Sequence, residues 1–152
     1  MVSVPVRMVT GFIAAALAVV TFHQITVWLL GMVGMVPRGG AYSLAGVPPW
    51  GVPRVLNLCF WGGLYGAVYG LIWPRLTRPA WLSGLVTGII AGLVGLFVVA
   101  AIKGNPIAGG WQVQAILRSL IINGMWGVGL GLFASLLLPA REAEGYRIPV
   151  RR

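Results

Sequence analysis

Acidic residues are almost absent from this sequence. There is no aspartate, and the two glutamates, Glu142 and Glu144, lie close to the C-terminus. The long apolar stretches therefore hold no carboxylate, whereas cation transporters and proton pumps generally place one near the membrane midplane. Paired-carboxylate hydrolysis and a Ser–His–Asp set are excluded there too, and no nucleotide-binding fingerprint is present. We therefore predict that the protein is not an enzyme.

Cysteine and histidine are just as scarce. Cys59 is the only cysteine, so neither an internal disulfide nor a cysteine metal cluster can form. His23 is the only histidine, which excludes a bis-histidine haem or a histidine-rich metal site within one chain. We expect no metal and no cofactor.

Charged residues make up 9% of the 152 residues, and hydrophobic residues make up 59%. A soluble domain has about a quarter of its residues charged. Several apolar stretches also reach the roughly 20 residues that cross a bilayer. The sequence therefore predicts an all-α integral membrane protein, with one four-helix transmembrane domain over residues 1–140 and a short basic tail over 141–152. The predicted spans are approximately residues 8–36, 54–73, 80–102 and 111–138.

The formal net charge of +9 comes from eleven Lys and Arg residues. They lie mainly in the segments between apolar runs, so we expect anionic lipid, and not nucleic acid, as their partner. One side of a four-span topology carries Arg7, Arg75, Arg78, Arg141, Arg147, Arg151 and Arg152, and the other carries Arg38, Arg54, Lys103 and Arg118. This excess predicts a bacterial inner-membrane protein with both termini in the cytoplasm.

The ends of spans two and four share a motif. Trp61-Gly62-x3-Gly66-x3-Gly70-x3-Pro74 recurs as Trp126-Gly127-x3-Gly131-x3-Ser135-x3-Pro139. One interpretation is a duplicated helical hairpin, whose halves are related by an axis along the membrane normal. The alternative is coincidence in a chain with 23 glycines.

Small residues recur every fourth position in three of the spans. In lipid, helices associate through close backbone approach, which such ladders permit. We therefore predict GxxxG-type helix packing, the alternative being a groove that holds a lipid tail or lines a pore. The ladder residues are Gly62, Gly66, Gly70, Gly84, Gly88, Gly92, Gly127, Gly131 and Ser135.

An aromatic ridge, Trp61, Tyr65, Tyr69 and Trp73, accompanies the ladder of span two. A ridge of this kind favours packing against a neighbouring helix or subunit. The alternative is one wall of a slot for a flat or long apolar ligand, such as a quinone or an acyl chain.

Polar residues within the spans are the candidate ligand or pore residues: His23, Gln24, Arg54, Asn57, Arg118 and Asn123. Polar groups at such depth usually face the bundle interior or water. We expect His23 to be structural, bonded to Gln24 or Asn57, with proton handling or ligand contact as the alternative. Arg118 is expected to reach the interface, or else to face a vestibule together with Arg54.

These features predict an accessory, assembly or scaffold subunit of a homo-oligomer or of a larger membrane complex. The alternative is a small-solute channel or transporter that prefers anions or neutral molecules. A quinone-binding protein is a third hypothesis, which depends on the aromatic ridge and His23.

Overall fold

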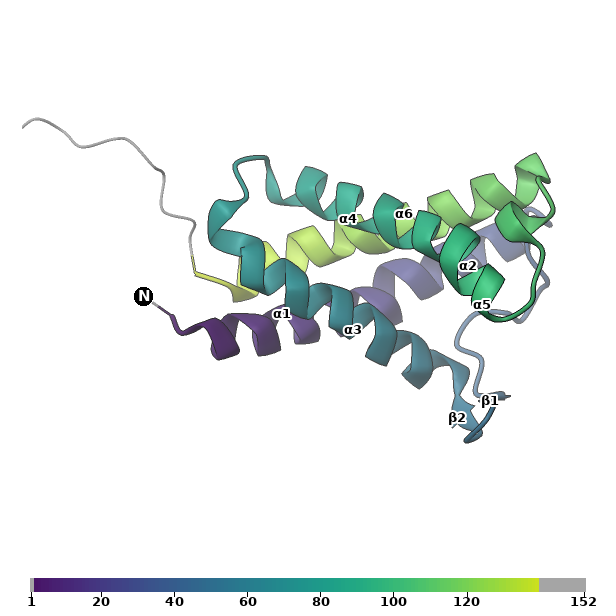
Figure 1. Ribbon diagram of the computed structural model, residues 1–152, viewed down its shortest axis with the longest axis horizontal. Helices are drawn as coiled ribbons and strands as arrows, with labels where there is room; N and C mark the ends of the chain where they lie inside the picture. The colour runs from purple at the N-terminus through teal and green to yellow at the C-terminus, as the bar shows by residue number, and fades with distance from the viewer. Residues whose placement is uncertain (1, 140–152) are drawn as a thin grey trace, which may run out of the picture.

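The computed structural model describes residues 2–139, and within this range four long helices form a bundle (Figure 1). The four helices are long and apolar enough to cross a membrane, which confirms the predicted all-α architecture of an integral membrane protein. They cover Val4–Met32, Arg54–Arg75, Ala80–Ile102 and Val113–Leu137.

The first long helix comprises α1 (Val4–Ala18), a π-helical turn η1 (Val19–His23) and α2 (Gln24–Met32). It begins and ends about one turn earlier than the predicted 8–36. Pro5 fits the first turn, where its missing N–H costs no hydrogen bond. Gly34 has φ 76°, a left-handed conformation that ends helices.

Spans two and three are also divided, whereas span four is one continuous helix. Span four starts after residue 111, later than predicted, because Gly109, Gly110 and Trp111 all have positive φ. Span two consists of α3 (Arg54–Ile72) and a 3-10 turn, η2 (Trp73–Arg75). Span three consists of α4 (Ala80–Val94), a π-helical turn η3 (Gly95–Val99) and α5 (Ala100–Ile102). A short turn, η4 (Ile107–Gly109), precedes span four, which is α6 (Val113–Leu137).

A small antiparallel hairpin lies between spans one and two. Its strands β1 (Gly46–Val47) and β2 (Val52–Pro53) pair Gly46 with Pro53 and Val47 with Val52. We call this side of the bundle the hairpin end and the opposite side, where α1 begins, the N-terminal end (Figure 1).

The helices pack as two antiparallel pairs, α1 with α3 and α4 with α6, which are joined through contacts between α1 and α6. By contrast, α3 and α4 contact each other little. They meet beside the turn that connects them and diverge toward the hairpin end (Figure 1). The seam between α3 and α4 is therefore the least closed side of the bundle.

Glycines lie where the paired backbones cross. A Cβ added at Gly66 or Gly70 would press on the backbone oxygen of Gly11 or of Arg7 in α1. These crossings leave no space for a side chain, as expected where backbone approach brings helices together in lipid.

The pair α4 and α6 crosses in the same manner. A Cβ added at Gly84 would press on the backbone of Gly127 and Gly131, and one at Gly88 would press on the Asn123 oxygen. Two predicted ladder positions do not touch the backbone of a neighbouring helix so closely. Gly62 faces side chains of Val19 and Trp126, and Gly92 lies in looser contact with α6.

Ser135, the last residue of the predicted ladder of span four, does not lie in the crossing with α4. Its side chain is exposed, and its hydroxyl donates to the Leu132 oxygen of the same helix at 2.7 Å. The crossing with α4 has ended before this position, because Gly131 already lies against Ala80, the first residue of α4.

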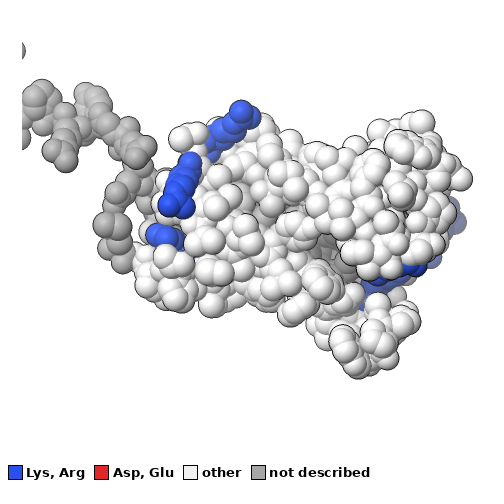
Figure 2. Space-filling model, in the orientation of Figure 1, with Lys and Arg blue, Asp and Glu red and all other residues white. Residues whose placement is uncertain are grey.

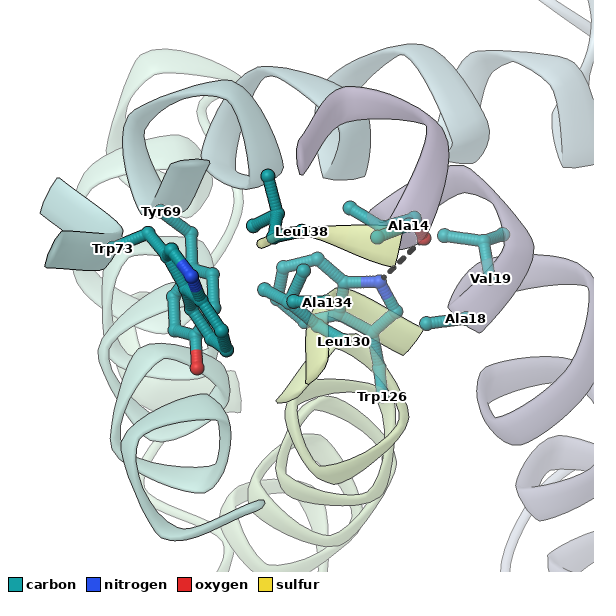
Figure 3. Packing of buried hydrophobic residues seen from close by; sticks show 10 residues of the cluster. Ala14, Ala18, Val19, Tyr69, Trp73, Trp126, Leu130, Ala134 and Leu138 are labelled. Carbon is teal, nitrogen blue, oxygen red and sulfur yellow. Dashed lines mark hydrogen bonds between the residues drawn. The ribbon is translucent and has the colours of Figure 1, made fainter. Parts of the chain in front are cut away.

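The buried core lies between α1, α3 and α6 (Figure 3). At its centre, the Trp126 ring is 3% exposed, and its indole N–H donates to the Ala15 oxygen at 3.1 Å. The other members of the core are Ala14, Ala18, Val19, Tyr69, Trp73, Leu130, Ala134 and Leu138.

Basic side chains lie at the two ends of the bundle, with a wide uncharged surface between them (Figure 2). Arg7, Arg75 and Arg78 belong to the N-terminal end, and Arg38 and Arg54 belong to the hairpin end. Such a distribution is typical of a protein whose apolar belt faces lipid. The predicted tail and its basic residues lie outside the described range.

Candidate functional site

A cluster of hydrogen bonds surrounds the π-helical turn of span one. Gln24 is almost completely buried, and its Oε1 accepts a hydrogen bond from the Tyr42 backbone N–H at 2.6 Å. This bond directs the amide NH₂ of Gln24 toward His23 Nδ1, 3.2 Å away. With Nδ1 accepting this bond, a neutral His23 ring carries its proton on Nε2. His23 is bonded to its neighbour in the same helix, and not across helices.

The side chain of Tyr42, in the long loop, bonds to the π-helical turn of span one. An α-to-π transition removes an α-helical partner from one or more backbone carbonyls. The Tyr42 hydroxyl donates to the Val20 oxygen, within this turn, at 2.8 Å. Tyr42 is itself in a left-handed conformation, with φ 52°. The long loop is therefore attached to span one through both the backbone and the side chain of one residue.

The same loop also caps the start of span two. The backbone N–H groups of Arg54 and Val55 donate to the Ala45 and Ser43 oxygens at 3.0 and 3.2 Å. The first N–H groups of a helix have no partner within the helix, so these two bonds satisfy part of that need. Residues 42–45 thus connect η1 to the beginning of α3.

Arg118 contacts the loop from span four. Its Nη1 donates to the Met35 oxygen at 3.4 Å, and the side chain is half-buried. Arg54 is exposed at the first position of α3, and Asn57 is half-buried one turn later. Asn123 donates to the Ser119 oxygen of its own helix at 2.9 Å. The structure thus brings His23 and Gln24 together and attaches Gln24 and Arg118 to one loop.

Three threonines of the spans bond to their own helices. Thr21, Thr26 and Thr87 each donate to the carbonyl four residues earlier, at 2.7 to 2.9 Å. This arrangement satisfies a hydroxyl without any second helix. The polar groups around η1 therefore serve mainly to hold backbone segments together, and His23 Nε2 is the donor left for other contacts.

The aromatic ridge of α3 turns from the surface into the core. Residues four apart are rotated by about 40° on an α-helix, so the ridge follows a spiral. Trp61 is 57% exposed, Tyr65 lies edge-on to Trp126 at 6.2 Å, and Tyr69 and Trp73 are 1% and 3% exposed.

The buried end of the ridge is bonded to neighbouring segments. The Tyr69 hydroxyl lies 2.8 Å from Ser83 Oγ and 3.1 Å from the Ala80 oxygen. The Trp73 indole donates to the Pro139 oxygen at 2.9 Å. These residues fix the α3–α4 turn and the end of span four, which is a structural role.

No metal-binding group of three or more His, Cys, Asp or Glu side chains occurs within residues 2–139. Comparisons of the chain with protein-family models, curated proteins and solved structures gave no match. The function is therefore inferred from the contacts of the chain itself.

Replacing Gln24 by leucine is expected to loosen the long loop. The change removes the acceptor of the part-buried Tyr42 backbone N–H, and such a hydrogen bond is worth about 1 kcal/mol, or roughly a fivefold change in an equilibrium. Trypsin cleavage after Arg38, in the folded protein in detergent, should accelerate by about that factor. Thr21→Val is the control, because its hydroxyl bonds within span one and not to the loop. Equal cleavage rates in Gln24→Leu and wild type would contradict the attachment.

Proposed function

We propose that this chain is a non-enzymatic integral membrane protein of the bacterial inner membrane, with both termini in the cytoplasm. It acts as an accessory, assembly or scaffold subunit of a homo-oligomer or of a larger membrane complex. Support comes from a closely packed bundle in which the buried side chains of Gln24, Thr26 and Ser83 bond to the chain itself. The orientation is supported by Arg7, Arg75 and Arg78 at the N-terminal end and by the basic residues of the tail sequence.

The two helix pairs support a duplicated hairpin as the origin of the fold. Gly11 crosses Gly66 and Gly70, just as Gly84 crosses Gly127 and Gly131. In the shared Trp-Gly motif, Gly62 corresponds to Gly127. The crossing in span two uses Gly66 and Gly70, so it lies one helical turn further along the motif than the crossing in span four. A ladder with a small residue at every fourth position permits such a displacement, because each step offers an equivalent groove.

The observation that carries the assembly proposal is the contrast between two tryptophans of that motif. Trp126 is 3% exposed and bonded to α1, whereas Trp61 is 57% exposed. Trp61 packs edge-on against Phe60, which is also exposed, at 5.5 Å. The chain covers one copy of the motif with its own helix and leaves the other open. A helix of a partner subunit would cover Trp61 as α1 covers Trp126.

We expect Trp61→Ala to weaken assembly. Aromatic residues that become buried at an interface often lose 2 kcal/mol or more on truncation, which is about thirtyfold in the dissociation constant. The mass of the complex, measured by light scattering in mild detergent, should shift toward the monomer. Trp28→Ala is the matched control, because Trp28 is 55% exposed and lies on α2. A wild-type protein that is monomeric without a co-purifying partner would overturn the proposal.

A channel or carrier for anions or neutral solutes is the alternative. It would use the donor at His23 Nε2 and the guanidinium of Arg118. The contacts support it less well, because Gln24 and Arg118 both bond to the loop at residues 35–42. These bonds close the region around η1 and do not open a path through the bundle.

A further inference from the structure

Positive and negative charges are separated along the sequence. Between positions 2 and 139 there is no acidic residue, and both glutamates, Glu142 and Glu144, follow shortly after this range, in the tail. Arg7 of α1 therefore has no carboxylate partner among the residues that the structure describes. The only carboxylate side chains that this sequence can offer to Arg7 are those two glutamates.

Arg7 lies on the face of α1 that turns toward the core. It precedes Ala14 by seven residues and Ala18 by eleven, and both spacings return to nearly the same line along an α-helix. Ala14 and Ala18 are completely buried in the core. Helical side chains lean toward the N-terminus of their helix, so the Arg7 side chain is directed toward the N-terminal end of the bundle. Its Nε is buried and has no hydrogen-bond partner among residues 2–139, although a buried donor is normally matched by an acceptor.

The end of span four reaches the same region. In Figure 3, Leu138 lies between Trp73 and the helix α1. The Trp73 indole donates to the Pro139 oxygen at 2.9 Å. Trp73 follows Gly70 by three residues, less than one helical turn, and a Cβ added at Gly70 would press on the Arg7 backbone oxygen. Pro139, and with it the beginning of the tail, is therefore held close to Arg7.

Both glutamates are near enough to Pro139 in the sequence to reach Arg7. Glu142 follows Pro139 by three residues and Glu144 by five. An extended chain covers at most about 3.3–3.6 Å per residue, so their Cα atoms can lie up to about 10 and 17 Å from that of Pro139. A carboxylate accepts charge-assisted hydrogen bonds from a guanidinium, and these are stronger than hydrogen bonds between neutral groups. The opposite charges can therefore meet over a distance that the chain spans.

We propose that the tail docks on the N-terminal end of the bundle through Glu142 and Glu144, whose carboxylates pair with Arg7. The pairing neutralises a half-buried cation. The docked tail covers the end of the core between α1, α3 and α6. This inference concerns a single chain and depends neither on assembly nor on the orientation in the membrane, so its failure would leave the proposed function untouched.

Trypsin cleavage after Arg147, in the folded full chain in neutral detergent, measures how readily the tail is released. Mass spectrometry follows the loss of residues 148–152. Arg7→Gln leaves the cleaved sequence unchanged and should accelerate cleavage by about fivefold, the upper range for an ion pair near the surface. Arg54→Gln, at the hairpin end, removes the same charge and is the matched control, which should be cleaved at the wild-type rate.

Glu142→Gln/Glu144→Gln tests the other side of the pair and covers the case in which Arg7→Gln does not fold. It should accelerate cleavage about fivefold more in the full chain than in a free peptide of residues 139–152, which reports the effect of the glutamates on trypsin itself. Adding Arg7→Gln should accelerate cleavage no further, because the pairing is already lost. Equal acceleration in chain and peptide would overturn the inference. A wild-type rate in Arg7→Gln together with faster cleavage in Arg75→Gln would also overturn it, and would assign the glutamates to the turn after α3.

Discussion

Replacing Trp126 by alanine is expected to lower the free energy of unfolding by about 3–5 kcal/mol, as is typical of a large aromatic side chain removed from a core. The indole is 3% exposed and fills the space between α1, α3 and α6. It contacts Tyr65 edge-on and bonds to the Ala15 oxygen. Its loss leaves a cavity at the point that joins the two helix pairs.

Two further variants help to interpret the loss of stability in Trp126→Ala. Trp126→Phe retains most of the ring but removes the indole N–H, so it should lose the hydrogen bond, about 1 kcal/mol, and some packing. Trp61→Ala should change the stability of the monomer by less than about 1 kcal/mol, because exposed positions contribute little. Unfolding in SDS, followed by circular dichroism, measures all three. Equal destabilisation by Trp61→Ala and Trp126→Ala would show that the two tryptophans have the same environment.

The spans could be predicted from the sequence because each depends on a local property. A run of apolar residues long enough for the bilayer identifies a membrane helix regardless of its neighbours. The limits of span one were less accurate, since they depend on a proline that the first turn accepts and on the conformation of Gly34. The closest crossings fell on ladder residues, since only a missing side chain permits backbone contact.

The role of Tyr42 could not be predicted in this way. It depends on a π-helical turn, which no residue pattern in Val19–His23 reveals, and on the bond to Gln24. The same holds for Trp61 and Trp126. Their local motif is the same, and what differs is whether another helix of the chain covers them, which is a property of the whole bundle.

Gly127→Val is expected to destabilise the protein by about 3 kcal/mol or more, at the upper end of the range for overpacked sites. A Cβ at this position would press on the Gly84 oxygen and the Gly88 backbone. Backbone atoms cannot rotate away as a side chain can, so α4 and α6 would have to separate. This separation would weaken every contact along the crossing.

Gly95 provides the matched control within the same helix pair. A Cβ there would meet nothing within 4 Å, so Gly95→Val should change stability by no more than about 0.5 kcal/mol. Gly66→Val tests the other pair, where the added atoms would press on Gly11 and Ala15. SDS unfolding midpoints should fall strongly for Gly127→Val and Gly66→Val alike, because both crossings join backbones directly. Similar midpoints for Gly127→Val and Gly95→Val would mean that the ladder does not mark the crossing, and unequal losses at Gly66 and Gly127 would show which pair carries more of the stability.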